Sequence, residues 1–319
     1  MTGVPLVSQE LGLLIFLLAV VSPALACEPG RAALDAPVAL VLSGGGAKGA
    51  WEAGVAGALI EQGVPVRLVA GSSAGALNAA MLADGRLDRL QAMWRSVRRD
   101  QVYALRPSVI FAGFLPGWAT LLALDAAGSL FDPSPLRELI AGALDFERVR
   151  ASPRRLVVVT TDLARRAPRL FDNATVSVDV LMAAAAVPGA FPPVNVDGTL
   201  LVDGGLTGRA PVLEALATEV PIGRALVLLS YAADEQGQPP TRLRRTLEEA
   251  FETAMVHQIR RDAELARFKY PAVDVQVLTP GVPLQLRPLE FDQVGMAAAL
   301  DRGRADALGC LERWRAGRP

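Results

Sequence analysis

The stretch that decides the fold is PVALVLSGGGAKGAWE, residues 37–52, in which an apolar run stops abruptly at three glycines. Pro37–Leu42 has the continuous apolar character of a strand buried on both faces. A helical pattern begins near Trp51 and continues to Gln62, and Gly63 is a typical signal for a helix C-terminus. The stretch therefore predicts a strand, a tight glycine turn and a helix in succession.

The same unit follows at once in VPVRLVAGSSAGALNAAML, residues 64–82. Val64–Ala70 predicts a second buried strand, Gly71–Gly75 a sharp turn, and Ala76–Leu82 the start of a helix. Two such units in a row indicate parallel strands in an α/β sheet that helices cover on both faces. Further strands are predicted at Leu156–Thr161, Thr199–Val202, Ala225–Ser230 and Val273–Leu278, and long helices at Leu243–Phe268 and Gln293–Trp314.

The composition fits one large domain. The chain has 319 residues, 51% of them hydrophobic, and a formal net charge of −1. Its basic residues form no cluster, so nucleic acid is not expected as a partner. Because the chain shows no fixed-period repeat and no long linker, residues 37–319 are predicted to form a single domain.

The N-terminus has the layout of a cleavable signal peptide over residues 1–26. The apolar run Leu11–Val21 is too short to span a bilayer as a helix, and an A-x-A pattern follows it at Ala24–Ala26. The first ten residues contain Glu10 and neither Lys nor Arg, which departs from the usual pattern. Export to the periplasm, the envelope or the medium is expected, with residues 27–36 as a short linker. A buried N-terminal helix is the alternative.

The two cysteines leave two hypotheses open. Cys27 directly follows the cleavage site, where a bacterial lipoprotein carries its acylated cysteine, but Pro23 and Ala24 depart from the usual lipobox. Cys27 could equally form a disulfide with Cys310 that closes almost the whole domain.

Val109–Leu124 is apolar with little periodicity and is interrupted at Gly113 and Pro116. One interpretation is a helical hairpin packed on the sheet. The other is a lid or lipid-facing patch.

Gly71–Gly75, with the sequence GSSAG, matches the nucleophile elbow G-x-S-x-G between a strand and a helix. Small residues on either side of Ser73 permit the tight turn that exposes a serine Oγ at the top of a sheet. The helix that follows places its positive N-terminal end behind that oxygen. The pattern predicts Ser73 as a nucleophile.

The glycine loop Gly44, Gly45 and Gly46 offers backbone N–H groups that can converge on an oxyanion. With Gly49 it also spells G-x-G-x-x-G, the dinucleotide fingerprint. That alternative needs an acid at the end of the second strand, yet residues 62–83 contain neither Asp nor Glu. A P-loop fails too, because no Ser or Thr follows the lysine in the required frame.

Asp203 follows the predicted strand Thr199–Val202 directly and precedes two glycines, so it is placed at the active edge of the sheet. An Asx turn or helix cap is the alternative for this residue alone.

Together these motifs resemble the patatin-like phospholipases. The segments SGGGAKG, GSSAGALNAA, AAAVPGAFPP at Ala184–Pro193 and DGG at residue 203 stand in that family's order, and so do TTDL at residue 160 and LEFD with a later Gly303. The resemblance covers roughly residues 37–316. It implies a three-layer α/β/α sandwich with a mainly parallel central sheet, and one catalytic domain over residues 37–319.

The resemblance also implies site residues and a reaction. Ser73 is the nucleophile, Asp203 the base of a dyad, and Gly44–Gly46 the oxyanion hole, with no metal and no cofactor. For Lys48 the residue itself suggests only that its stem packs over the loop and that it caps carbonyls, and the resemblance adds a modest electrostatic contribution toward an anionic head group. Gly205 stands where many members carry Ala, and the exchange is expected to be tolerated.

His257 is the only histidine of the chain and tests this interpretation. Ser73, Asp203 and His257 follow the chain order of an α/β-hydrolase triad. His257, however, falls in the middle of a long helical pattern, whereas a triad histidine comes from a loop.

The leading hypothesis is a lipid acyl hydrolase that acts through an acyl-enzyme on a phospholipid or an acylglycerol, at a membrane surface. The alternatives are a catalytically silent lipid-binding or envelope protein on the same fold, an α/β-hydrolase esterase using His257, and a nucleotide-dependent oxidoreductase.

Overall fold

The computed structural model describes residues 30–33, 35–112, 115–233, 235, 237 and 241–316. The predicted signal peptide and Cys27 lie outside these residues. Cys310 is fully buried and carries no free thiol. Acylation of Cys27 and a disulfide between Cys27 and Cys310 both stay predictions.

One sheet of eight strands forms the centre of the described residues, in the order β10-β9-β1-β2-β5-β8-β7, with β6 also paired to β5. Strands β10, β9, β1, β2 and β5 run parallel, whereas β6, β7 and β8 are antiparallel to their neighbours. The strands are β1 (Val38–Leu42), β2 (Val66–Gly71), β5 (Arg155–Asp162), β6 (Ala167–Phe171), β7 (Val194–Val196), β8 (Thr199–Asp203), β9 (Arg224–Leu228) and β10 (Asp274–Leu278). The prediction of a mainly parallel sheet is confirmed.

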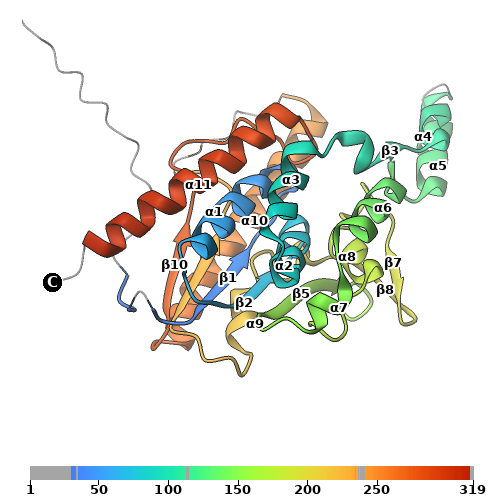
Figure 1. Ribbon diagram of the computed structural model, residues 1–319. Helices are drawn as coiled ribbons and strands as arrows, with labels where there is room; N and C mark the ends of the chain where they lie inside the picture. Colours follow the sequence, from blue (N-terminus) through green and yellow to red (C-terminus); the bar gives the residue numbers. More distant parts are fainter. Residues whose placement is uncertain are drawn as a thin grey trace, which may run out of the picture.

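Helices cover both faces of the sheet, which gives the three layers (Figure 1). The first core joins alternate residues of β1, such as Leu40 and Leu42, to helices on one face: α1 (Gly49–Glu61), α2 (Ala74–Asp84), α3 (Leu87–Ser96), α6 (Ser134–Ala143), α8 (Val178–Ala184) and α11 (Gln293–Ala316). The second core joins Ala39 and Val41 to α9 (Val212–Leu216) and α10 (Leu243–Lys269). This alternation explains why the strands are apolar throughout.

Short elements complete the chain. They are the 3-10 helices η1 (Gly46–Lys48), η2 (Arg99–Gln101) and η3 (Gly204–Leu206), helices α4 (Pro107–Ala112), α5 (Gly117–Ala127) and α7 (Phe146–Arg150), and a two-stranded sheet of β3 (Ala104–Leu105) and β4 (Phe131–Asp132). None of the helices among the described residues is both long and apolar enough to cross a membrane.

The hairpin of α4 and α5 projects from one end of the molecule (Figure 1). It carries apolar side chains that are largely exposed: Ile110 (53%), Phe111 (68%) and Leu122 (62%). The predicted helical hairpin is therefore present, but it does not pack on the sheet in the way that one interpretation expected.

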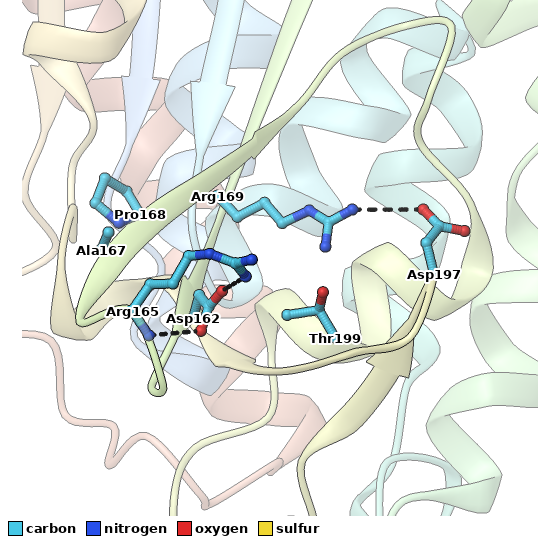
Figure 2. Close-up of a pocket in the computed structure, with 7 residues that line it drawn as sticks. All are labelled: Asp162, Arg165, Ala167, Pro168, Arg169, Asp197 and Thr199. Carbon is cyan, nitrogen blue, oxygen red and sulfur yellow. Dashed lines mark hydrogen bonds and ion pairs between the residues drawn. The ribbon is translucent and has the colours of Figure 1, made fainter.

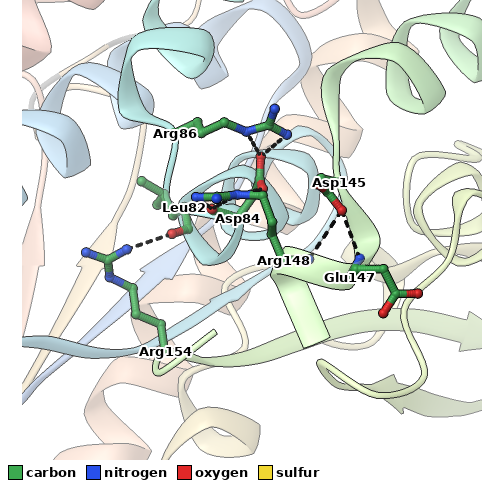
Figure 3. A network of polar contacts seen from close by, with 7 residues as sticks. All are labelled: Leu82, Asp84, Arg86, Asp145, Glu147, Arg148 and Arg154. Atoms are coloured by element: carbon green, nitrogen blue, oxygen red, sulfur yellow. Dashed lines mark hydrogen bonds and ion pairs between the residues drawn. The ribbon is translucent and has the colours of Figure 1, made fainter. Parts of the chain in front are cut away.

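Arginines fix the C-terminal end of α2, the helix that follows the elbow (Figure 3). The buried Asp84 carboxylate accepts hydrogen bonds from Arg86 Nε (2.7 Å) and Arg148 Nε (3.0 Å). Arg148 also donates to the Asp84 carbonyl, and Arg154 donates to the carbonyl of Leu82 (3.0 Å). The last carbonyls of α2 thus find partners, and the helix is held in place behind Ser73.

Candidate active site

Strands β2 and β8 approach each other along one edge of β5. β2 pairs with β5 as far as Gly71 opposite Val158, and β8 pairs with β5 from the other direction, with Asp203 opposite Thr160. Both strands use the same edge, because β6 pairs with residues 158–162 and so occupies the opposite edge. Ser73 lies two residues beyond Gly71, so this register brings it level with Asp203.

The turn after α8 holds the backbone of both residues. Ser73 N–H donates to the carbonyl of Ala184 (2.9 Å), and Asp203 N–H donates to the carbonyl of Ala186 (2.9 Å). These carbonyls begin the AAAVPGAFPP run. The run therefore fixes the two candidate catalytic residues relative to each other.

Ser73 has the conformation of an elbow nucleophile. It precedes the first residue of α2 with φ 52° and ψ −136°, a left-handed backbone that a residue with a side chain rarely adopts. Its neighbour Ser72 is fully buried and donates from Oγ to the carbonyl of Arg209 (2.6 Å). Ser73 itself is 7% exposed, at the N-terminal end of an 11-residue helix.

Asp203 is fully buried at the end of β8. Its Oδ1 accepts a hydrogen bond from Gly205 N–H (2.7 Å), whereas Oδ2 has no hydrogen-bond partner among the described residues. Burial raises the pKa of this carboxyl above its ordinary value, and Arg209, Gly205 N–H and the nearby Ser73 hydroxyl oppose that shift. The Ser73 hydroxyl is close to the carboxyl without a fully aligned hydrogen bond, which is common for catalytic pairs without substrate.

Thr161 ties the Asp203 turn to β5. Its Oγ1 donates to the carbonyl of Asp203 (2.9 Å) and lies 2.9 Å from Thr207 Oγ1. The TTDL motif thus positions the turn that carries the carboxylate.

The backbone amides of the glycine loop differ in their hydrogen bonding. Gly44, Gly45 and Gly46 all have positive φ angles of 76°, 107° and 58°. Gly44 N–H donates to the Glu52 carboxyl (2.9 Å), so it is already engaged. The N–H groups of Gly45 and Gly46 have no hydrogen-bond partner among the described residues, so two of the three predicted amides remain available for an oxyanion.

Glu52 is the residue that orders this loop, and the motif analysis did not single it out. It is fully buried in α1 and accepts hydrogen bonds from Ser43 N–H (2.7 Å) and Ser43 Oγ (2.8 Å) as well as from Gly44. Burial raises the pKa of Glu52 to about 8, against the lowering effect of these donors and of Arg209.

Lys48 is buried and pairs within the protein. Its Nζ lies 3.6 Å from Glu235 Oε1 and 3.5 Å from the centroid of the Tyr231 ring. Desolvation lowers the pKa of this ammonium, and Glu235 and Glu252 act in the opposite direction. The packing role expected of Lys48 fits this arrangement. A contact with an anionic head group would have to compete with these acids.

His257 lies on the exposed surface of α10, away from any loop that could bring it to Ser73. The structure therefore gives no support to a Ser73–Asp203–His257 triad.

Gly205 lies close to the side chains of Asp203 and Arg209. A Cβ at this position would lie 2.8 Å from Asp203 Oδ1 and 3.0 Å from Arg209 Nη1. Separations this short do not occur without displacement of the neighbours. Alanine at this position therefore requires Asp203 or Arg209 to shift, and whether the site tolerates it stays a prediction.

A polar cavity of about 400 Å³ lies nearby, between the β5–β6 and β7–β8 turns (Figure 2). Its charges pair with one another: Arg165 Nη1 is 2.7 Å from Asp162 Oδ2, and Arg169 Nη2 is 3.5 Å from Asp197 Oδ2. The cavity includes neither Ser73 nor Asp203 in its lining, so it is not the candidate active site.

Comparison with known proteins identifies the family. The family model described as patatin-like phospholipase matches residues 40–216, more than half of the chain. The chain therefore belongs to the patatin-like phospholipase family.

Curated relatives match over part of their length. The chain is 32% identical over 191 residues to an uncharacterized NTE family protein of Mycobacterium tuberculosis, which covers 60% of this chain and 48% of the relative. It is 30% identical over 177 residues to patatin-like phospholipase domain-containing protein 6 of Homo sapiens. This alignment covers 54% of this chain and 12% of the human protein. The chain thus spans about half the length of the mycobacterial relative.

Two solved structures align over most of the chain. VipD from Legionella pneumophila covers 88% of this chain and 67% of its own, with 16% identity and a TM-score of 0.47. ExoU in the ExoU-SpcU complex of Pseudomonas aeruginosa covers 92% and 57%, with 17% identity and a TM-score of 0.40.

Proposed function

We propose that this protein is a serine lipid acyl hydrolase that cleaves a fatty-acyl ester of a phospholipid or an acylglycerol. The observation that carries the proposal is the meeting of β2 and β8 on β5, which brings a strained Ser73 to a buried carboxylate, Asp203. Membership of the patatin-like phospholipase family supports a lipid substrate.

In the proposed reaction, Asp203 accepts the hydroxyl proton of Ser73 while Oγ attacks the ester carbonyl carbon. The resulting oxyanion faces the amides of Gly45 and Gly46, and one such donor is typically worth about 3 to 4 kcal/mol. The intermediate then expels the alcohol, which takes the proton from Asp203 and leaves an acyl ester on Ser73. Water attacks this ester with Asp203 as base and releases the fatty acid.

The alternative of a catalytically silent lipid-binding or envelope protein explains less. A buried carboxylate oxygen that has no hydrogen-bond partner among the described residues and a serine in a strained conformation each cost stability. A binding protein gains nothing from either feature, whereas a dyad needs both.

We further propose that the α4–α5 hairpin contacts the lipid surface. The run that holds Ser73 and Asp203 also holds the base of this hairpin: Leu130 N–H donates to the carbonyl of Gly189 (3.0 Å), and Phe131 N–H donates to that of Ala190 (2.9 Å). The hairpin that carries the exposed apolar side chains is thus hydrogen-bonded at its base to the run at 184–193, which also positions Ser73 and Asp203. This arrangement would bring lipid close to the nucleophile.

Variants of the dyad test the proposal on a panel of phospholipids and p-nitrophenyl esters. Ser73→Ala and Asp203→Asn should each lower kcat by several powers of ten, because general-base assistance alone is worth about 10² to 10⁴. The loss in the double variant should be no larger than in either single variant, because the two residues act as a unit. The matched control His257→Ala should stay within a few-fold of the parent. A folded His257→Ala that is as inactive as Ser73→Ala would overturn the dyad.

A further inference from the structure

Arg209 is a buried cation that the proposed reaction has not yet used. It lies between η3 and α9 and is 6% exposed. Its carbonyl accepts the hydrogen bond from Ser72, but its guanidinium makes neither a hydrogen bond nor an ion pair with any described residue. A buried charge that has no direct partner among the described residues costs stability unless the site uses it.

The guanidinium extends from the Asp203 turn to the glycine loop. Nη1 and Asp203 Oδ1 both lie within 3.0 Å of the point where Gly205 would carry a Cβ. Nη2 lies 3.5 Å from the corresponding point of Gly45, one of the two free oxyanion amides. Gly205 thus leaves space that the Arg209 side chain fills, and Nη2 comes within van der Waals distance of the Gly45 position.

During the proposed reaction, negative charge moves from the Asp203 carboxylate to the oxyanion at the glycine loop. Before attack the negative charge is on Asp203; in the tetrahedral intermediate Asp203 is neutral and the charge is on the oxyanion. A triad would form an imidazolium to balance that oxyanion. A dyad forms no cation, so a fixed positive charge beside both positions would compensate the negative charge before and after proton transfer.

We propose that Arg209 is the fixed counter-charge of the Ser73–Asp203 dyad, a positioning residue that keeps Asp203 ionised and favours an oxyanion at Gly45. This inference rests on the proposed hydrolase function. The titratable groups around the guanidinium are Asp203, Glu52 and Tyr231, and the nearby Arg209 charge lowers the pKa of each of them. Burial raises the pKa of Tyr231, so it stays neutral, and Asp203 is the group whose charge the reaction changes.

The test is the pH profile of kcat/KM with a soluble p-nitrophenyl ester from pH 5 to 9. Arg209→Gln should move the acid limb to higher pH by about one unit or more, because an opposite charge at this range shifts a carboxyl pKa by about 1 to 3 units. Its kcat should fall about tenfold or more. Arg209→Lys should keep the acid limb near its parent position, and added guanidinium should raise the activity of Arg209→Ala but not of the parent.

Arg165→Gln is the matched control, because Arg165 is 74% exposed and pairs with Asp162 outside the site. A folded Arg209→Gln with the parent's acid limb and kcat would overturn the inference. If that variant does not fold, a shifted limb in Arg209→Lys together with no rescue of Arg209→Ala by guanidinium would overturn it.

Labelling of Ser73 by a fluorophosphonate separates the two proposals. A parent that is labelled, with an unlabelled Ser73→Ala, supports the hydrolase and leaves the Arg209 variants to decide the counter-charge. A parent that is neither labelled nor active removes both.

Discussion

Gly205 and Arg209 fit together because the first has no side chain: a Cβ on Gly205 would lie 3.0 Å from Arg209 Nη1. Gly205→Ala should therefore displace Arg209 or Asp203, lower the free energy of unfolding by about 1 to 3 kcal/mol and lower kcat about tenfold or more. Urea unfolding and ester hydrolysis measure the two effects.

Gly142→Ala is the control for that substitution. Gly142 lies within α6, and a Cβ there would meet no atom within 4 Å. Alanine should leave activity unchanged and stabilise the helix by about 0.5 to 1 kcal/mol. A Gly205→Ala variant that behaves like this control would show that the site adjusts without loss.

Glu52 should make stability depend on pH. Its pKa rises from 4.5 to about 8 on folding, so between these values the folded state binds more protons than the unfolded state. Its contribution to stability is complete below pH 4.5 and is lost as pH rises to about 8. Glu52→Gln does not titrate, so the free energy of unfolding of the parent should fall relative to this variant across that window.

Urea unfolding of both proteins at pH 5, 6.5, 8 and 9 measures this difference. Because the other carboxyl groups are common to the two proteins, their contributions cancel. A difference that is the same at every pH would mean that Glu52 has an ordinary pKa.

Asp84 should be one of the polar residues on which stability depends most. Its carboxylate is buried and serves both Arg86 and Arg148 at the end of α2. Asp84→Ala should lower the free energy of unfolding by about 1.5 to 3 kcal/mol, because it removes the hydrogen bonds of a buried carboxylate to two arginines. Glu147→Ala breaks only the exposed pair with Arg150 and should cost less than about 1 kcal/mol. Equal effects of the two substitutions would contradict this ranking.

Phe111 tests the contact with lipid. Phe111→Asp should lower hydrolysis of phosphatidylcholine vesicles by about tenfold or more, since burial of a Phe side chain is worth about 1.5 to 3 kcal/mol. Hydrolysis of a short soluble ester should stay unchanged. Phe268→Asp on α10, where the side chain is 85% exposed, is the control and should change neither rate. Loss on both substrates would make Phe111 a structural residue of the hairpin.

The hypothesis of a cleaved signal peptide predicts the first residue of the mature protein. We propose that cleavage after Ala26 leaves Cys27 as the first residue, and intact-mass measurement of the envelope fraction would determine this. The added mass of acyl chains would establish a lipoprotein, and an unmodified Cys27 would reject it. A protein that retains Met1 would contradict both hypotheses.

Sequence patterns predicted the parallel half of the sheet well, because buried strands and tight glycine turns leave local signals. They did not reveal that β8 runs antiparallel, since an apolar pattern carries no direction. They also missed β6 and β7. The latter has three residues and lies at the edge of the sheet.

The candidate site divides in the same way. Ser73, Asp203 and the glycine loop stand in motifs that can be read along the chain. The roles of Glu52 and Arg209 arise from contacts between segments. Glu52 left one local signal, a carboxylate in the first turn of α1 with no other charged residue before Glu61 at the end of the helix.

The register of β5 has a consequence for which parts of the chain tolerate insertions. The segment between α2 and β5, residues 85–154, can change length without altering the place of Ser73 or Asp203, because both are set by pairing to Val158 and Thr160. One residue added within β8 after its pairing to Asp162 would place Val202 opposite Thr160 and Asp203 opposite Val159, which turns the carboxylate to the other face of the sheet. Variation in length among relatives should therefore accumulate in the first segment and be absent from the second.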